Sequence, residues 1–436
     1  MAGVRAPHAG LGKSGALLVF RGFLSKNRFF KPCARGQLVL YWKKKEKRAG
    51  QGPRTEFHRM KIAIFGGSFD PVHAEHVRIA RAAREKLGAD KIIVVPAGLP
   101  PHKQERHLAP AAARLEMARL AFSGIPGCEV SPYEINAGGT SYTVRTVHRF
   151  RERYPQDELY LLVGADMLRD FYSWKQPEEI LSMAQLVACG REGDPADFQK
   201  EQKRFSARFG KPFIPLGYTG AAVSSTEVRA LCAFGEDVRS LVPAEVADYI
   251  DANELYRVGP VRRALEYLTP ARRKHSLRVA LMAAERSASA GVSEYAAVLA
   301  AGLHDCAKNL PADSPLLKGF APPEEVPAPV LHQYSGAYVA ECILGVTDAD
   351  VLDAIRYHTS GKPEMTALGK LIFLSDMLEA GRDFPGIRKL RRLFAENLNA
   401  CMYHCLKQEL KHLKKGGGNI YPLTFRAYEY YKEHRK

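Results

Sequence analysis

The sequence has no run of about eighteen or more apolar residues, the length that a membrane-spanning helix needs, so no membrane partner is predicted. Its eight cysteines are scattered, and none forms a Cys-x-x-Cys pair. In a chain of 436 residues this spacing argues against a disulfide framework and favours reduced thiols in a cytoplasmic protein. Cys401 and Cys405 lie one helical turn apart, and we expect them to be small buried residues.

Acidic residues are scarce at the start of the chain, where residues 1–59 hold fourteen Lys and Arg against two Glu. The net charge of the whole chain is +17, which leaves +5 for the other 377 residues. Because the excess lies in one terminal segment, nucleic acid is not expected as a partner of the folded part. We predict that residues 1–59 are a disordered basic extension, translated from a region upstream of a true start at Met60. A mitochondrial presequence is the alternative.

The length of the chain predicts two or three domains. From Met60 onwards, strand-like and helix-like segments alternate, which predicts a parallel sheet covered by helices on both faces. Ligands of such sheets bind at the carboxyl ends of the strands. We predict this Rossmann-like, doubly wound α/β domain over residues 60–258, with strands at Ile62–Phe65, Lys91–Pro96, Glu129–Ser131, Glu158–Val163 and Leu186–Ala188, and helices at His76–Leu87, Ala111–Phe122, Thr143–Tyr154 and Glu178–Met183.

The pattern changes after Gly259-Pro260, where the helical period dominates and no β-rich run follows. The sequence therefore predicts a second, all-α domain over residues 262–434. Its expected helices are Val261–Leu268, Arg273–Ser289, Tyr295–Ala307, Val330–Leu344, Asp348–His358, Met365–Ala380 and Gly386–Lys414.

A glycine-rich turn directly follows the first predicted strand. It reads Gly66-Gly67-Ser68-Phe69-Asp70-Pro71-Val72-His73-Ala74-Glu75-His76. The glycines let the backbone approach a phosphate, and the start of the next helix favours anions. The two histidines are three residues apart and could donate to one phosphoryl group. The alternative is an ordinary strand-to-helix turn with two incidental histidines.

Two later segments add cationic and hydroxyl groups. Lys103 follows the second predicted strand in the stretch PPHK (100–103). The stretch SSTEVR (224–229) places three hydroxyls at a helix entrance and an arginine one turn further on: Ser224, Ser225, Thr226 and Arg229. Such hydroxyls either cap the helix or hold phosphate oxygens.

Residues 60–257 resemble the bacterial nicotinate-nucleotide adenylyltransferase family. The resemblance rests on GGSFDPVHAEH (66–76), PPHK (100–103), SYTVRT (141–146), GADML (164–168), Trp174, SSTEVR (224–229) and VPAEVADYIDANELY (242–256). It implies that ATP and nicotinate mononucleotide are joined to give the deamido dinucleotide and pyrophosphate. Another adenylyltransferase, for phosphopantetheine or the amide mononucleotide, is one alternative, and a catalytically dead nucleotide-binding module is the other.

The resemblance also implies roles for single residues. Those expected to hold the phosphates of ATP are His73, His76, Lys103, Ser225 and Arg229, with Mg²⁺ bridging the phosphates. Asp166 would contact a ribose, and Thr143 and Trp174 would frame the nicotinate ring. The rest of the expected nucleotide site comprises Gly66, Gly67, Ser68, Phe69, Gly164, Ser224 and Thr226. Two residues depart from the family pattern: Glu75 replaces a frequent Gly, and Arg145 replaces a frequent Asp, which puts the preference for the acid over the amide in doubt.

The helical part contains a second set of chemical groups: His275, the adjacent pair His304-Asp305, and Asp376. Imidazole and carboxylate suit Fe, Mn and Zn. Adjacent side chains on one helix diverge unless the helix end is distorted, so a surface His beside a capping Asp is the alternative. However, the pair follows an apolar run, Leu299–Leu303, and buried polar groups need partners. Further histidines of the predicted helices are His332 and His358, whereas His404 and His412 are expected to be solvated.

Residues 263–434 resemble the HD superfamily of metal-dependent phosphohydrolases, and within it the bacterial symmetrical diadenosine tetraphosphate hydrolases. The matching stretches are RKHSLRVA (273–280), AAGLHDCAK (300–308), LHQYSGA (331–337), AIRYHTSGKPEM (354–365) and LIFLSDMLEAGRDF (371–384). The resemblance implies hydrolysis of dinucleoside polyphosphates to ADP with a transition metal, iron in the family, on His275, His304, Asp305 and Asp376. It further implies a second metal or phosphate on His332 and His358, and phosphate contacts from Lys308 and Arg382.

Alternatives to this second activity are an HD hydrolase for another nucleotide and a regulatory, non-catalytic or oligomerising helical domain. The sequence leaves a homo-oligomer open.

Overall fold

The computed structural model describes residues 59–99, 108–191, 198–416 and 420–435. The predicted basic extension, except Arg59, and the predicted phosphate ligand Lys103 lie outside these ranges. Within them, no helix is long and apolar enough to cross a membrane.

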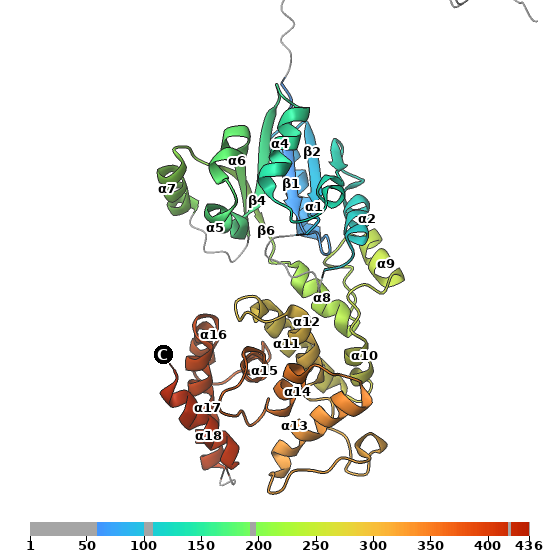
Figure 1. Cartoon of the computed structure of the whole chain (residues 1–436), viewed down its shortest axis with the longest axis vertical. Helices are drawn as coiled ribbons and strands as arrows, with labels where there is room; N and C mark the ends of the chain where they lie inside the picture. The colour runs from blue at the N-terminus through green and yellow to red at the C-terminus, as the bar shows by residue number, and fades with distance from the viewer. Residues whose placement is uncertain (1–58, 100–107, 192–197, 417–419, 436) are drawn as a thin grey trace, which may run out of the picture. The chain divides into compact units, whose positions relative to one another are not determined.

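A six-stranded parallel sheet forms the first part of the described chain (Figure 1). The strand order is β3-β2-β1-β4-β5-β6, so the order reverses between the neighbours β1 and β4. Ligands of open α/β sheets bind at the carboxyl ends of the strands beside such a reversal. The strands are β1 Lys61–Gly67, β2 Lys91–Pro96, β3 Cys128–Val130, β4 Glu158–Gly164, β5 Gln185–Arg191 and β6 Ile214–Gly220.

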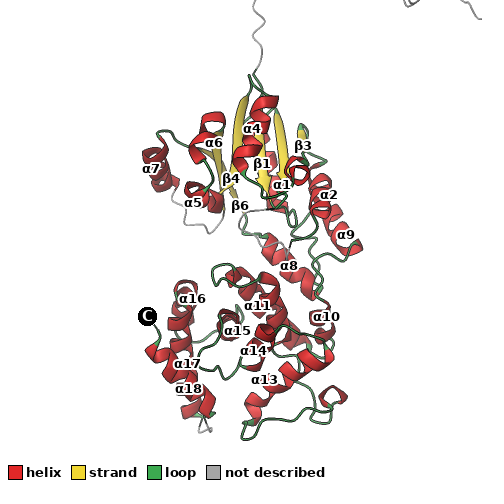
Figure 2. Cartoon of the chain, viewed as in Figure 1, coloured by secondary structure: helices red, strands yellow, loops and turns green. Residues whose placement is uncertain are grey.

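Helices cover both faces of the sheet (Figure 2), which confirms the predicted doubly wound fold. Alternate residues of β1 enter different cores. Ala63 and Phe65 pack in one hydrophobic cluster, and Ile62 and Ile64 pack in the other. The helices of this part are α1 Ala74–Lys86, α2 Ala111–Phe122, α3 Tyr133–Ala137, α4 Thr143–Arg153, α5 Ala165–Asp170, α6 Pro177–Met183 and α7 Phe198–Phe209, with a short 3₁₀ helix at Phe171–Ser173.

Strand β6 and helix α7 were not expected from the sequence. The strand contains Pro215 and Gly217, and both residue types weaken a strand signal. It lies at the edge of the sheet and pairs only with β5 among the described strands, which is where a proline is tolerated.

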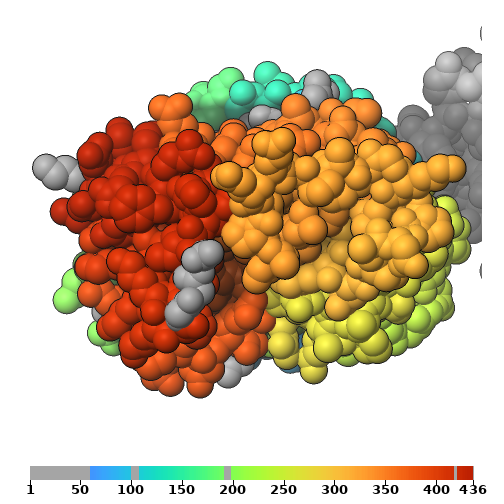
Figure 3. All heavy atoms as spheres, turned by 90° about the horizontal axis from the view of Figure 1, so that it is seen from below, coloured from blue at the N-terminus to red at the C-terminus, as the bar shows by residue number. Residues whose placement is uncertain are grey.

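The rest of the described chain is helical, as predicted. Its helices are α8 Ser225–Phe234, α9 Ala244–Ala252, α10 Gly259–Leu265, α11 Pro270–Ser287, α12 Glu294–Leu303, α13 Ala328–Tyr338, α14 Ala349–Arg356, α15 Ala367–Leu378, α16 Ile387–Glu396, α17 Leu398–Lys415 and α18 Pro422–Glu433. Alpha-helix α13 continues as a π-helix over Val339–Ile343. Figure 3 shows α16–α18 in red beside the orange residues that precede α14.

The single helix predicted over Gly386–Lys414 is wrong. The chain breaks at Asn397, whose backbone is extended and whose side chain accepts a hydrogen bond from the amide of Ala400 at 2.9 Å. Asn397 therefore ends α16 and caps α17. Helix α18, which follows the break in the described residues, was also not predicted. The predicted burial of Cys401 and Cys405 is confirmed, and His404 and His412 are exposed as expected.

One hydrophobic core holds the helical part together, and it also includes residues of α8. Ala230, Ala233 and Phe234 of α8 belong to this core together with residues of α10, α11 and α12. Helix α8 begins soon after the last strand, so it joins the end of the sheet to the helical core.

Candidate functional sites

The turn after β1 brings the two histidines of the first motif together. His73 is the N-cap of α1, and its backbone amide donates to Nδ1 of His76 at 3.1 Å. Their rings stack with centroids 3.7 Å apart. His73 is buried and His76 half-buried. Stacked imidazoles at a helix start form a compact pair of donors at the positive end of the helix dipole, an arrangement suited to a phosphate.

The start of α8 contacts this same turn. The hydroxyl of Ser225 donates to the carbonyl oxygen of Pro71 at 2.9 Å, and Nη1 of Arg229 donates to the carbonyl oxygen of Asp70. Ser224 caps the helix by accepting from the amide of Glu227 at 3.1 Å. The two motifs, about 150 residues apart in the chain, therefore meet at the carboxyl edge of the sheet.

Residues predicted for the ribose and the pyridine ring come from other elements of the same α/β fold. Gly164 ends β4, and the exposed Asp166 in α5 forms an ion pair with Arg169. Thr143 begins α4. Trp174 is half-buried, and its ring centroid lies 5.1 Å from that of Phe171. The predicted roles of Asp166, Thr143 and Trp174 in binding the ribose and the pyridine ring stay predictions.

Arg114 is a buried residue of this region that the motifs of the sequence did not identify. Its guanidinium donates to the carbonyl oxygens of Ala97 at 2.6 Å, Gly98 at 2.8 Å and Ser68 at 2.9 Å. It thereby ties the loop after β2 to the glycine-rich turn after β1. Burial lowers the pKa of Arg114, yet four carbonyl acceptors keep the guanidinium satisfied, the fourth being that of Ala109 at 3.1 Å from Nε. A lone arginine in a helix carries no periodic pattern that reveals such a role.

Asp70 is a second residue that stabilises the glycine-rich turn, and no role was predicted for it. It is fully buried, and Oδ1 accepts hydrogen bonds from the hydroxyl of Tyr256 at 2.7 Å and the amide of Ala109 at 3.1 Å. These bonds fix the turn that carries His73. The carboxylate also raises the pKa of Tyr256 beyond the increase that burial causes, so this phenol remains a donor.

The second site forms where α12 ends. The helix stops at Leu303, and His304 and Asp305 lie in the turns that follow it. This is the distorted helix end that adjacent ligands require. Both side chains are fully buried, so the alternative of a surface His beside a capping Asp is excluded.

Four histidines and two carboxylates converge at this point. Nε2 of His275 lies 2.9 Å from Oδ1 of Asp376 and 3.4 Å from Nε2 of His304. The ligand atoms of these three residues all lie within 4.8 Å of one another, as do those of a second group, His304, Asp305 and His358. His332 lies beside the second group, with Nε2 3.3 Å from Oδ1 of Asp305.

The two carboxylate oxygens of Asp305 face different histidines. Oδ2 lies 3.5 Å from Nε2 of His304 and 3.9 Å from Nε2 of His275. Oδ1 lies 3.3 Å from His332 and 3.4 Å from His358. Asp305 therefore stands between the two ligand groups, so the predicted first and second sites are neighbours.

In His304 and His358, the hydrogen bond made by Nδ1 explains why Nε2, which faces the other ligands, is suited to a metal. Nδ1 of His304 faces the carbonyl oxygen of Ala301 at 2.6 Å, and Nδ1 of His358 faces that of Ile355 at 2.8 Å. A carbonyl only accepts, so each Nδ1 carries the proton and each Nε2 presents a lone pair to the centre. Burial lowers the pKa of His358 to about 4, which keeps this ring neutral at pH 7.

A carboxylate outside the ligand groups holds the His275 ring. Oε1 of the buried Glu379 lies 3.3 Å from Nδ1 of His275. Burial alone would raise the pKa of Asp376, but its hydrogen bond with the His275 ring holds that pKa well below its usual range. Both carboxylates of the centre are thus anionic, as metal ligands must be.

Cations surround these carboxylates. The two predicted phosphate contacts lie here, Lys308 with Nζ 3.3 Å from Asp305 and Arg382 with Nη2 2.9 Å from Asp376. Arg272 was not predicted, and its Nη1 donates to Oδ2 of Asp305 at 2.7 Å. Positive groups beside a metal centre suit a polyphosphate substrate.

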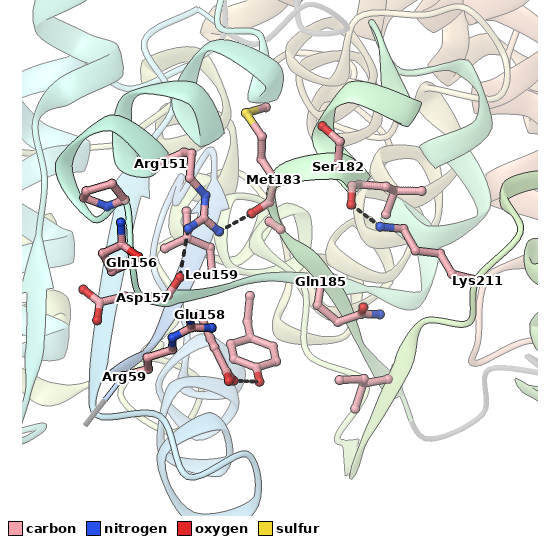
Figure 4. Close-up of a pocket in the computed structure, with 15 residues that line it drawn as sticks. Arg59, Arg151, Gln156, Asp157, Glu158, Leu159, Ser182, Met183, Gln185 and Lys211 are labelled. Atoms are coloured by element: carbon pink, nitrogen blue, oxygen red, sulfur yellow. Dashed lines mark hydrogen bonds between the residues drawn. The ribbon is translucent and has the colours of Figure 1, made fainter. Parts of the chain in front are cut away.

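A separate open cavity lies at the amino ends of the strands (Figure 4). Its volume is about 540 Å³, and Arg151, Glu158 and Lys211 are among its lining residues. Arg151 donates to the carbonyl oxygen of Asp157 at 2.8 Å, so this charge is already used within the fold. The cavity lies at the opposite edge of the sheet from the glycine-rich turn, so it is separate from the predicted nucleotide site.

Two family models match this chain, one in each part. Residues 64–231 match the cytidylyltransferase-like family, and residues 272–381 match the HD domain. A nicotinate-nucleotide adenylyltransferase of Thermus thermophilus is 41% identical over 198 residues, which cover 45% of this chain and all of that protein. A solved HD superfamily hydrolase involved in NAD metabolism, from Clostridium acetobutylicum, is 31% identical, with 41% of this chain and 96% of that chain covered and a TM-score of 0.38.

Two relatives contain both parts in one chain. A nicotinate-nucleotide adenylyltransferase/Ap4A hydrolase of Mycoplasma genitalium is 30% identical over 329 residues, which cover 74% of this chain and 89% of the relative. The protein with the same name from Mycoplasma pneumoniae is 32% identical over 321 residues, with 73% and 88% covered. Because the similarity extends through the sheet and the helical part alike, the chain belongs to the family of two-part nicotinate-nucleotide adenylyltransferase/Ap4A hydrolase proteins.

Proposed function

We propose that the α/β part transfers AMP from ATP to nicotinate mononucleotide, releasing pyrophosphate. The observation that carries this proposal is the meeting of His73 and His76 with the start of α8 at the carboxyl edge of the sheet. Asp166, Thr143 and Trp174 are proposed to bind the ribose and the pyridine ring, and Lys103 to contact the triphosphate. Mg²⁺ would accompany ATP, since it is held mainly by the phosphates and needs few protein ligands.

Positioning and charge stabilisation suffice for this chemistry. The attacking phosphate of the mononucleotide is already an anion, so no group has to remove a proton from it. The bond from the α-phosphorus of ATP to its bridging oxygen breaks as the new phosphoanhydride bond forms, and pyrophosphate leaves. His73 and His76 would donate to phosphate oxygens as negative charge shifts towards the leaving group, and their stacked rings support this role.

We propose that the helical part hydrolyses dinucleoside polyphosphates such as diadenosine tetraphosphate to ADP. The HD domain match implies a divalent metal, and the inward lone pairs of His304 and His358 together with two anionic carboxylates fit one. Iron is proposed from the family resemblance. When bound, such ions supply Lewis-acid activation of water and of a phosphoryl group. Lys308, Arg382 and Arg272 would hold the phosphates of the substrate.

The proposal extends to the domains of the chain, its cellular location and its partners. We propose two domains, residues 60–258 and 262–434, in a cytoplasmic protein that works on free nucleotides rather than on nucleic acid or membranes. Association into a homo-oligomer stays open.

The first test follows pyrophosphate release by the full chain with ATP, Mg²⁺ and either nicotinate or nicotinamide mononucleotide. Fast release with the acid and slow release with the amide is the expected result. Release only with the amide would reverse the assigned substrate, and no release with either would overturn the transferase proposal.

The hydrolase is tested separately. The full chain, loaded with iron, is given diadenosine tetraphosphate, and ADP is the expected product. The double variant H304A/D305A should lose both the bound metal and ADP formation while pyrophosphate release continues. If the metal-loaded chain leaves the substrate intact, the helical part is not this hydrolase.

A further inference from the structure

Arg229 of α8 is bound by a carboxylate from another helix. Its Nε donates to Oε1 of Glu294 at 2.7 Å, and its Nη2 donates to Oε2 of the same carboxylate. The hydroxyl of Thr226 donates to Oε2 as well, at 3.1 Å. Glu294 is the first residue of α12, the helix that leads to His304 and Asp305. Two residues of the transferase motif SSTEVR therefore hold a carboxylate that lies 65 residues further along the chain.

This ion pair is largely removed from water. The side chain of Arg229 is 12% exposed and that of Glu294 is 23% exposed. The rest of the guanidinium also has partners: Nη1 donates to the carbonyl oxygen of Asp70 and lies 3.8 Å from Oδ2 of the same residue, and Nη2 donates to the hydroxyl of Thr226 at 2.9 Å. Water and salt screen a largely buried charge pair only weakly. The carboxylate of Glu294 therefore offsets much of the positive electrostatic potential around Arg229.

Helix α12 cannot shift easily to follow a moving arginine. Its residues Ala297, Ala300 and Ala301 are fully buried in the helical core, and the side chain of Ser293 caps its start. The position of Glu294 is therefore set by the packing of the helical part. Arg229, by contrast, belongs to the turn-and-helix contact that the proposed ATP site uses.

We propose that Glu294 sets the affinity of the transferase for ATP by competing with the triphosphate for Arg229. This inference rests on the proposed transferase function. A polyphosphate that approaches Arg229 meets a carboxylate on the same donors, and like charges at this distance repel. ATP must therefore displace Glu294 or bind beside it, and either event weakens ATP binding. The pyridine mononucleotide does not compete with Glu294 for Arg229, because the residues proposed to bind it belong to α4 and α5 and include Trp174.

The test compares Glu294→Gln with the unchanged chain in steady-state pyrophosphate release. Glutamine keeps the size and one acceptor for Arg229 but removes the charge. We expect the KM for ATP to fall roughly threefold to tenfold and the KM for nicotinate mononucleotide to stay the same. Glu285→Gln is the matched control, because Glu285 is an exposed carboxylate on α11 that pairs with Arg286 at 3.7 Å; it should leave both constants unchanged.

Each outcome decides the matter. An unchanged or higher KM for ATP in E294Q overturns the inference while the transferase proposal stands. No pyrophosphate release by the unchanged chain overturns the transferase proposal instead. If E294Q does not fold, hydrogen exchange on the unchanged chain replaces it. A non-hydrolysable ATP analogue should then speed amide hydrogen exchange in the peptide that contains the first turn of α12. An unchanged exchange rate in this peptide would show that ATP does not compete with Glu294 for Arg229.

Discussion

At the scale of single residues, the orientation of imidazole rings decides what the helical part can bind. The sequence predicted a buried pair from the apolar run before His304 and Asp305, and its resemblance to the HD superfamily implied the ligand set that adds His275 and Asp376. It did not show which ring nitrogen faces the centre, because that depends on carbonyl oxygens three residues earlier in each turn. Glu379 was missed for a similar reason, since its contact with His275 spans 104 residues of chain.

Glu379→Gln should weaken metal binding without removing a ligand. The carboxylate orients His275 and makes its Nε2 a better donor to a metal, and loss of such a partner typically costs about 10–100-fold in affinity. The measurement is a titration of the metal-free chain with Fe²⁺ or Mn²⁺. Glu396→Gln, at an exposed position at the end of α16, is the control. Equal affinities in the two variants would contradict the role of Glu379.

His76→Ala should slow pyrophosphate release by about 100–1000-fold, the usual effect of removing one donor from a charge-stabilising site. The stacked partner His73 remains but loses the acceptor of its backbone amide. Rates are measured at saturating ATP and mononucleotide. His148→Ala serves for comparison, because His148 is half exposed and forms an ion pair with Glu179 away from the turn. A loss below tenfold would remove His76 from the catalytic groups.

At the scale of elements, the sheet was the more predictable part. Five strands were predicted at or close to their positions, because their cores are short apolar runs between polar turns. The sixth, β6, carries proline and glycine and is held by its pairing with β5, so its own residues give little signal. The prediction of one continuous helix over Gly386–Lys414 is wrong at a single residue, Asn397. The residues on both sides of Asn397 follow the helical period, so the pattern gives no sign that Asn397 caps a new helix.

Asn397→Ala tests this break. Removing the cap of α17 should lower the free energy of unfolding by about 1 kcal/mol, whereas Asn397→Ser keeps an oxygen acceptor and should lose far less. Both variants are compared with the unchanged chain by urea unfolding, followed through helix content. Equal stability of the alanine and serine variants would show that the side-chain bond to Ala400 contributes nothing.

At the scale of the whole described molecule, α8 packs in both parts of the chain. Its first turn contacts the glycine-rich turn after β1, and its last turn lies in the core of the helical part. From the sequence we predicted that SSTEVR belongs to the transferase and that the domain boundary lies near residue 258. Both predictions rest only on the order of segments along the chain. The packing of Phe234 against helices that follow that boundary depends on contacts between segments far apart in sequence, which no local pattern encodes.

Phe234→Ala should therefore affect both activities, although the residue precedes the predicted boundary. Phe234 is 5% exposed, and truncation of a buried phenylalanine costs about 3–5 kcal/mol. We expect the temperatures at which pyrophosphate release and diadenosine tetraphosphate hydrolysis are lost to fall together. Phe425→Ala, at a position that is 47% exposed on α18, should leave both temperatures nearly unchanged. A fall in the transferase temperature alone would mean that α8 does not stabilise the helical core, and that the two parts unfold independently.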